Sequence, residues 1–273
     1  MISLFTKTAF DASRNITKLY STSFTLGIRT LDKKFHDAIY GIYGMVRYAD
    51  EIVDTFHDYD KKALLDKFKL DTFQAIKDGI SLNPVLHAYQ HTVNKYGIDN
   101  SLTEAFFHSM EMDLNKTIHD EASYNEYIYG SAEVVGLMCL RVFTEWDKTL
   151  YENTQLHARA LGAAFQKVNF LRDIQSDFAE RGRVYFPDVD FTVFTPAIKS
   201  QIEADIQKDF DNALIGIKML PNSSKRGVYL AYRFYLKLFK RIKNTEAKKI
   251  QTARIRVPDY QKAGLMLHAM MGL

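Results

Sequence analysis

The chain has 273 residues, of which 47% are hydrophobic and 25% charged, and its formal net charge is +3. This composition supplies a sizeable core, and so small a charge excludes an electrostatic argument for nucleic-acid binding. The single cysteine, Cys139, excludes an internal disulfide and a cysteine-based zinc site, and it fits a reducing cytosol. Because we find no signal peptide and no bilayer-spanning apolar run, we expect a cytoplasmic protein that at most lies on a membrane surface.

Apolar residues follow a three-and-four spacing along most of the chain, and no alternating strand pattern persists. We therefore expect an all-α fold in one domain, residues 1–273. The helices are expected over residues 7–19, 33–54, 61–78, 84–97, 102–118, 124–143, 150–178, 200–219 and 224–243, with a last one from Pro258. Ser101 and Ser123 each stand three residues before a glutamate, a pattern that predicts a capping box.

The segment Tyr20-Ser21-Thr22-Ser23-Phe24, which follows the first helix, is rich in hydroxyl groups. Such a segment either caps a helix or donates hydrogen bonds to a phosphate. In the next helix, Gly41 and Gly44 each cost about 1 kcal/mol of helix stability relative to alanine. They therefore either permit close helix packing or widen a channel for a lipid.

Two rows of polar residues carry the clearest chemical signal. Their members recur every fourth residue and so stand one turn apart on a helix: Asp50 and Asp54 in one row, and Asn169, Asp173 and Asp177 in the other. An arginine, Arg47 or Arg172, accompanies each row. One row alone is typical of a solvated acidic face, whereas two similar rows on separate helices indicate opposing walls of one site. Stacked carboxylates repel unless a cation joins them, and Mg²⁺ prefers such oxygen ligands together with a substrate phosphate.

Three segments resemble the squalene and phytoene synthase family: RYADEIVD from Arg47, YGSAEVVG from Tyr129 and QKVNFLRDIQSDFAERGRVYFP from Gln166. The resemblance extends from about Tyr20 to Arg256, and the overall sequence is most like the bacterial phytoene synthases. It implies a single all-α isoprenoid synthase bundle whose acid rows face each other across a central cavity. It also implies a prenyltransferase that joins two identical prenyl diphosphates head to head through a cyclopropyl diphosphate intermediate.

The resemblance further implies roles for individual residues. Mg²⁺, or Mn²⁺ in its place, would be held by Asp50, Asp54, Asn169, Asp173 and Asp177. Diphosphate would be bound by Arg47, Arg172 and Arg254. Many members carry histidine and lysine where this chain has Tyr20 and Thr22, so hydroxyls would take their part in substrate binding, from Tyr20, Ser21 and Ser23. The reacting carbons would lie near Gln166 and three cavity tyrosines, Tyr127, Tyr185 and Tyr235.

For the substrate, the resemblance favours two geranylgeranyl diphosphates and phytoene as product, a step of carotenoid biosynthesis. Ile28 and Tyr40 stand where bulkier aromatic residues close the pocket for a shorter chain, and Gly41 and Gly44 are expected to add room. The alternative substrate is farnesyl diphosphate, which gives dehydrosqualene or, with NADPH, squalene. An alternative of another class is a non-catalytic lipid-binding or assembly protein of the same fold, which the two intact acid rows disfavour. Release of a hydrocarbon favours peripheral membrane contact, for which the basic C-terminal region is the candidate.

Overall fold

The computed structural model describes residues 2–115, 118–175, 182–187, 189, 193–252 and 255. Its helices are α1 (Ile2–Tyr20), α2 (Thr22–Arg29), α3 (Lys33–Asp54), α4 (Lys61–Asp78), α5 (Pro84–Tyr96), α6 (Asn100–Asn115), α7 (Glu121–Ile128), the π-helical η1 (Tyr129–Glu133), α8 (Val134–Thr144), α9 (Lys148–Ile174), α10 (Pro196–Met219), α11 (Asn222–Lys243) and α12 (Ala247–Ile250). Within those ranges no β-strand occurs, and Ile118 and Val184 form an isolated parallel bridge. The expected all-α class is confirmed, while the helix expected from Pro258 lies outside the described residues.

Both expected capping boxes are wrong. α6 begins at Asn100, where the Asp99 carboxylate accepts a hydrogen bond from the Ser101 backbone N–H at 2.8 Å. α7 begins at Glu121, and the Asp120 carboxylate accepts from the Ser123 N–H at 2.8 Å. The two serines therefore lie inside the first turn. An aspartate just before them supplies a charged acceptor, which the positive end of the helix dipole favours over a neutral hydroxyl.

The segment expected as one helix over 124–143 contains a π-helical turn, η1, between α7 and α8. Gly130 lets this turn pack closely on α6, because a Cβ there would lie 2.4 Å from the Ala105 carbonyl oxygen. Such π-helical turns are frequent at functional sites. α2 was not among the expected helices. The hydroxyl-rich segment caps it, since the Ser21 Oγ accepts from the Phe24 N–H at 3.2 Å.

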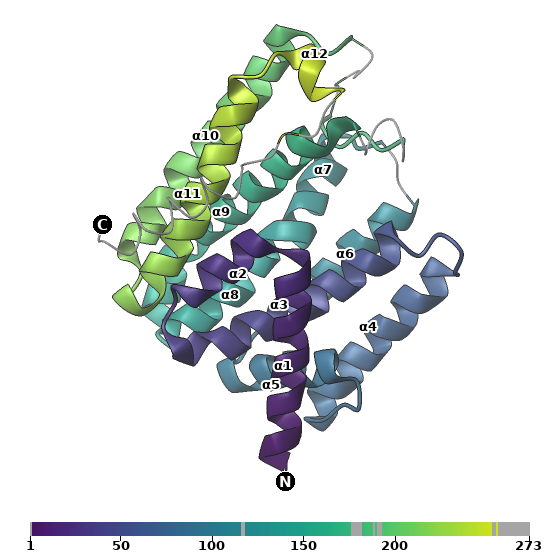
Figure 1. Ribbon diagram of the computed structural model, residues 1–273, viewed down its shortest axis with the longest axis vertical. Helices are drawn as coiled ribbons and strands as arrows, with labels where there is room; N and C mark the ends of the chain where they lie inside the picture. The colour runs from purple at the N-terminus through teal and green to yellow at the C-terminus, as the bar shows by residue number, and fades with distance from the viewer. Residues whose placement is uncertain are drawn as a thin grey trace.

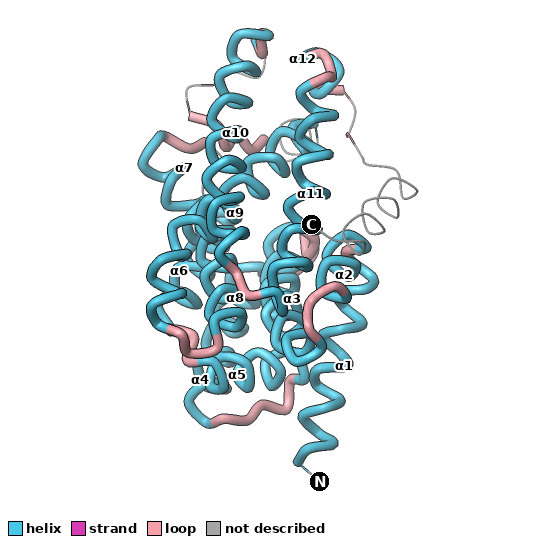
Figure 2. Tube along the Cα trace, turned by 90° about the vertical axis from the view of Figure 1, so that its left-hand side faces the viewer, coloured by secondary structure: helices cyan, strands magenta, loops and turns pink. Residues whose placement is uncertain are grey.

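The buried apolar side chains form two large clusters. One joins residues of α3, α4, α5, α6 and α8, and the other joins α7, α9, α10 and α11 with Tyr185 and Phe186. α9 packs most extensively on α10 and also contacts α8, η1 and α11, while α1 packs against α3 and α5 on the opposite side of the bundle (Figures 1 and 2). No helix in the part of the chain that the structure describes has an apolar stretch long enough to cross a membrane.

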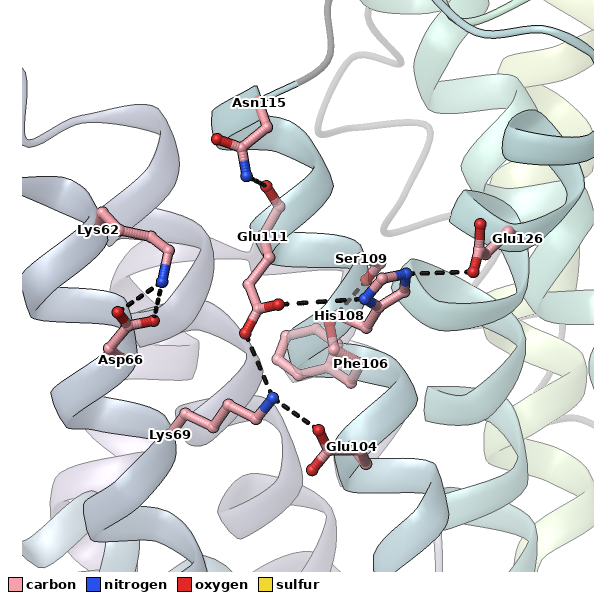
Figure 3. A network of polar contacts seen from close by, with 10 residues as sticks. All are labelled: Lys62, Asp66, Lys69, Glu104, Phe106, His108, Ser109, Glu111, Asn115 and Glu126. Atoms are coloured by element: carbon pink, nitrogen blue, oxygen red, sulfur yellow. Dashed lines mark hydrogen bonds and ion pairs between the residues drawn. The ribbon is translucent and has the colours of Figure 1, made fainter.

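A network of ion pairs holds the outer edge of α6 to α4 and α7 (Figure 3). The Lys69 ammonium lies 2.6 Å from Glu104 and 3.2 Å from Glu111, and the His108 ring hydrogen-bonds to Glu126 at 3.1 Å. Because most of these side chains are half exposed, each pair contributes at most about 1 kcal/mol. The network therefore lies on the outer face of α6, and the opposite face of this helix packs against the interior.

Candidate active site

A cavity of about 520 Å³ lies between the two apolar clusters. Its walls come from α2, α3, α6, η1, α8, α9, α10 and α11, with Tyr20 of α1 and Tyr127 of α7. Polar side chains gather at one end: Tyr20, Ser21, Arg47, Asp50, Gln166, Asn169 and Arg172. The rest of the wall is mainly apolar and includes Ile28, Leu31, Ile39, Leu140, Phe143, Ile217 and Leu220. The cavity therefore has the form required by a long ligand with one charged end.

The division between the polar and the apolar wall follows from the order of residue types along α3 and α9. On α3 the cavity side is one helical stripe that changes from apolar to charged toward its C-terminal end: Ile39, Ile42, Tyr43, Val46, Arg47 and Asp50. α9 repeats this order, with Leu161 and Phe165 preceding Gln166, Asn169 and Arg172. Because each stripe stays on one face of its helix, the two C-terminal ends together form the polar end of the cavity.

The expectation that Gly41 and Gly44 add room to this cavity is wrong. Neither residue lines it, and neither does Tyr40. A Cβ at Gly41 would lie 2.9 Å from the Ala88 carbonyl oxygen, and one at Gly44 would lie 2.8 Å from the Ser13 Oγ. These glycines allow α3 to pack closely on α5 and α1, which was the alternative interpretation. Of the positions considered for chain-length selection, Ile28 does line the cavity.

Arg47 lines the polar end of the cavity. Its guanidinium donates to Asp50 at 2.5 Å and to Glu51, and it lies 4.4 Å from the ring centroid of Tyr20. The Arg47 Nε is buried and has no hydrogen-bond partner among the described residues. A buried N–H without a partner is costly, so this donor is suited to an anionic ligand. Ser21 lines the same end of the cavity, whereas Ser23 does not.

The expected metal ligands have a donor set suited to a hard cation. Asp50 bonds to Arg47, Asp54 Oδ1 accepts from Arg183 at 2.8 Å, and Asp173 Oδ1 accepts from the Arg172 Nε at 2.9 Å. Each of these carboxylates thus has a guanidinium beside it, which offsets the repulsion within the rows. Among the described residues no group of three or more metal-ligating side chains is assembled. Asp177, the last member of the second row, lies outside the described residues, as does Arg254.

Gln166 and Asn169 belong to a chain of amide hydrogen bonds on the cavity wall. The Gln166 amide donates to the Ser131 Oγ in η1 at 3.3 Å, and the Asn169 amide donates to the Gln166 Oε1 at 3.5 Å. The Tyr235 hydroxyl donates to the Asn169 Oδ1 at 3.4 Å, and the Tyr235 ring stacks on Phe165 at a centroid distance of 3.9 Å. These contacts fix the amides and aromatic faces where the polar and apolar walls meet.

A second hydrogen-bond network, centred on Asp113, was not predicted from the sequence. The Tyr127 hydroxyl donates to the Asp113 Oδ2 at 2.7 Å, and the Tyr185 hydroxyl donates to the Oδ1 at 3.2 Å. Arg183 links this network to the acid row through Asp54. Tyr127 lines the cavity, whereas Tyr185 is stacked on Phe170 behind it, at a centroid distance of 4.1 Å.

A sequence signal for Asp113 did exist. It follows Phe106 and Met110 at the spacing of one helical face, so an acidic residue continues an apolar stripe. Burial raises the pKa of Asp113 to about 7, while the charge of Arg183 and the hydrogen bond from Tyr127 act in the opposite direction. A carboxyl on the inner face of an amphipathic helix requires such partners.

Comparison with known proteins agrees with this geometry. The squalene/phytoene synthase family matches residues 17–261. The chain is 28% identical over 256 residues to phytoene synthase 1, chloroplastic, of Solanum lycopersicum, covering 86% of this chain and 61% of that protein. It is 30% identical over 208 residues to presqualene diphosphate synthase of Zymomonas mobilis, with coverages of 75% and 67%. It is 27% identical over 280 residues to 15-cis-phytoene synthase of Synechococcus elongatus, with coverages of 93% and 90%.

Solved structures show the same architecture. A dehydrosqualene synthase superposes with a TM-score of 0.82 at 20% identity, covering 97% of this chain and 96% of that one. The squalene synthase HpnC of Alicyclobacillus acidocaldarius gives a TM-score of 0.76 at 20% identity, with coverages of 88% and 94%. The protein thus has the all-α fold of the isoprenoid synthases. From the extent of the family match, it belongs to the squalene/phytoene synthase family.

Proposed function

We propose that the protein is a prenyltransferase that condenses two prenyl diphosphates head to head. The observation that carries this proposal is the order of the cavity wall, in which arginine, carboxylate and amide groups lead directly into a mainly apolar chamber on the same two helices. A prenyl diphosphate has the same order, a charged head on a long hydrocarbon. The polar end would bind the diphosphates, and the apolar chamber would hold both chains away from water.

At the polar end of the cavity, the carboxylates and the arginines would have different roles. In our proposal Mg²⁺, or Mn²⁺ in its place, is held by Asp50, Asp54, Asn169, Asp173 and Asp177. The metal would supply Lewis-acid neutralisation of the diphosphate leaving group. Arg47 and Arg172 would bind diphosphate oxygens through their planar guanidinium groups. The unpartnered Nε of Arg47 supports this assignment, because a phosphate oxygen would satisfy it.

Loss of diphosphate from an allylic carbon leaves a carbocation, which must be kept from water and from nucleophiles. Tyr127, Phe165 and Tyr235 line the cavity, and their ring faces can attract a cation without attacking it. The hydrogen bonds of Gln166 hold its amide in one orientation beside this region. The apolar wall beyond them excludes water, which would otherwise capture the cation as an alcohol.

For the substrate we propose geranylgeranyl diphosphate, with phytoene as the product. Small residues from four helices and η1 line the cavity, and they leave room for long chains: Gly27, Ala132, Ala158, Ala213 and Ala231. Four glycines also line it, but an added Cβ at each would collide with a neighbouring segment, so they serve close packing: Gly136, Gly162, Gly216 and Gly227. Two of the relatives described above are named phytoene synthases. The second candidate is farnesyl diphosphate as substrate, which the similarity to a presqualene diphosphate synthase supports. In that case NADPH is required for squalene but not for dehydrosqualene.

The test is incubation of the purified protein with Mg²⁺ and each prenyl diphosphate, with and without NADPH, followed by chromatography and mass analysis of the hydrocarbons. We expect phytoene from geranylgeranyl diphosphate alone, and no product from the Asp173→Asn variant. Asp209→Asn is the matched control, because Asp209 is an acid of α10 that pairs with Lys167 at 2.7 Å and does not line the cavity. A squalene-type product would support the second substrate. A folded protein that yields no hydrocarbon would favour a non-catalytic lipid-binding or assembly role.

We also propose a cytoplasmic protein that touches a membrane at its periphery to release its product. Near the polar end of the cavity, Leu19, Tyr20 and Tyr48 expose 85%, 49% and 39% of their surface. Apolar and aromatic groups of this kind suit the boundary between lipid headgroups and chains. Co-sedimentation with phospholipid vesicles tests this proposal, and a Leu19→Ser variant should bind less.

A further inference from the structure

The carboxyl group of Asp113 is buried inside the protein, and this burial costs free energy. Its side chain is 4% exposed, and most of the buried residues of α6 are apolar. Burial of a charge in such surroundings is unfavourable unless several donors compensate it. Asp113 receives hydrogen bonds from two tyrosine hydroxyls, and Arg183 lies 4.0 Å from its Oδ1. A methionine like its neighbour Met112 would fill the space without this cost, so packing alone does not account for an acid here.

Tyr127 connects this acid to the cavity. It lines the cavity wall, and its hydroxyl proton is committed to the Asp113 Oδ2 at 2.7 Å. A phenol has one proton, so Tyr127 offers the cavity its ring and no hydrogen-bond donor. A hydrogen bond to an ionised carboxylate is charge-assisted, and it increases the electron density of the donating phenol. The ring face of Tyr127 then attracts a cation more strongly than that of a free tyrosine.

The aromatic residues around Asp113 also screen it from the cavity. Tyr185 lies 5.1 Å from Tyr127 and is stacked on Phe170, and His119 lies 5.3 Å from Tyr127. Asp113 itself does not line the cavity. A carboxylate in direct contact with a carbocation would form an ester, which ends turnover. Behind a layer of rings, the same charge acts through space and cannot form that bond.

We propose that Asp113 is a positioning residue that fixes the Tyr127 ring as a cation-stabilising wall and places a shielded negative charge behind it. This inference rests on the proposed function. Because Tyr185 donates to the same carboxylate and Arg183 joins it to Asp54, the network also holds the wall in register with the acid row. The ligand that the wall recognises is an allylic carbocation or a positively charged analogue of one.

The first experiment measures turnover of the Asp113→Asn, Tyr127→Phe and double variants above neutral pH. We expect Asp113→Asn to lower kcat by about 100-fold, the effect of removing one preorganised electrostatic group, with KM for the prenyl diphosphate changed by less than about threefold. Release of the cyclopropyl diphosphate intermediate should increase relative to hydrocarbon. The double variant should be no slower than Tyr127→Phe, since the two residues act as one unit. The Asp209→Asn control should keep its kcat.

The second experiment does not depend on turnover. Calorimetry compares the binding of a prenyl dimethylammonium ion and of the neutral hydrocarbon with carbon in place of nitrogen, each with inorganic diphosphate and Mg²⁺. Asp113→Asn should weaken binding of the ammonium ion by about tenfold and leave the neutral compound unchanged. The proposed role of Asp113 would be overturned if Asp113→Asn changed the affinities for both compounds equally. A kcat of Asp113→Asn close to that of the wild type would overturn it as well. If the wild type had no turnover, but Asp113→Asn still weakened binding of the ammonium ion alone, only the proposed function would be refuted.

Discussion

A single methyl group at the contact between α9 and η1 should test how tightly the cavity wall is packed. Gly162 lines the cavity, and a Cβ there would lie 2.5 Å from the Ala132 carbonyl oxygen and 3.0 Å from the Glu133 Cα. These are backbone atoms, which no side-chain rotation can move away. Overpacking costs about 1–3 kcal/mol. Alanine also stabilises the helix relative to glycine by up to about 1 kcal/mol, because its helix propensity is higher. Because a clash with backbone atoms belongs to the upper part of the overpacking range, about 2–3 kcal/mol, we expect Gly162→Ala to lose about 1–2 kcal/mol of unfolding free energy in net.

The assay is thermal unfolding by calorimetry, in which a loss of this size lowers Tm by roughly 2–4 °C in a protein of this length. Gly27→Ala is the matched control, because Gly27 also stands in a helix and lines the cavity. Its added Cβ would meet the Gly227 carbonyl oxygen at 3.7 Å, which is an ordinary contact, so this variant should keep or raise Tm. A Gly162→Ala protein as stable as the wild type would refute the packing argument.

Three further predictions concern the cavity and its surroundings. Arg47→Lys removes the buried Nε and the planar fork, so KM for the prenyl diphosphate should rise about tenfold while Tm stays close to that of the wild type. Ile28→Phe adds volume to the apolar wall, and the ratio of kcat/KM for geranylgeranyl over farnesyl diphosphate should fall at least about tenfold; an unchanged ratio would show that Ile28 does not limit chain length. Burial raises the pKa of Asp113 to about 7, so the folded protein retains a proton that the unfolded chain releases, and stability falls as the pH rises from about 4 to about 7. Asp113→Asn should lack this loss, and parallel Tm–pH curves for the two proteins would contradict it.

The helices could be predicted from the sequence because their signals are local. The proline at the start of α5, the glycine at its end and the apolar spacing within α3 and α4 require no knowledge of the rest of the chain. The π-helical turn at Tyr129–Glu133 could not be predicted in this way. It lies where Gly130 packs closely on α6, a contact between residues distant in sequence.

For the site, the sequence alone determined the residue types and the spacing that bring Arg47 and Asp50, and likewise Asn169 and Arg172, to one face of their helices. Which of those faces meet is a property of the packing. The tertiary structure decided that Gly41 and Gly44 serve helix contacts, that Tyr185 stands behind Tyr127, and that Asp113 on α6 joins both tyrosines. The physical reason is that helical periodicity specifies a face, whereas the cavity arises where faces of several helices close around a common space.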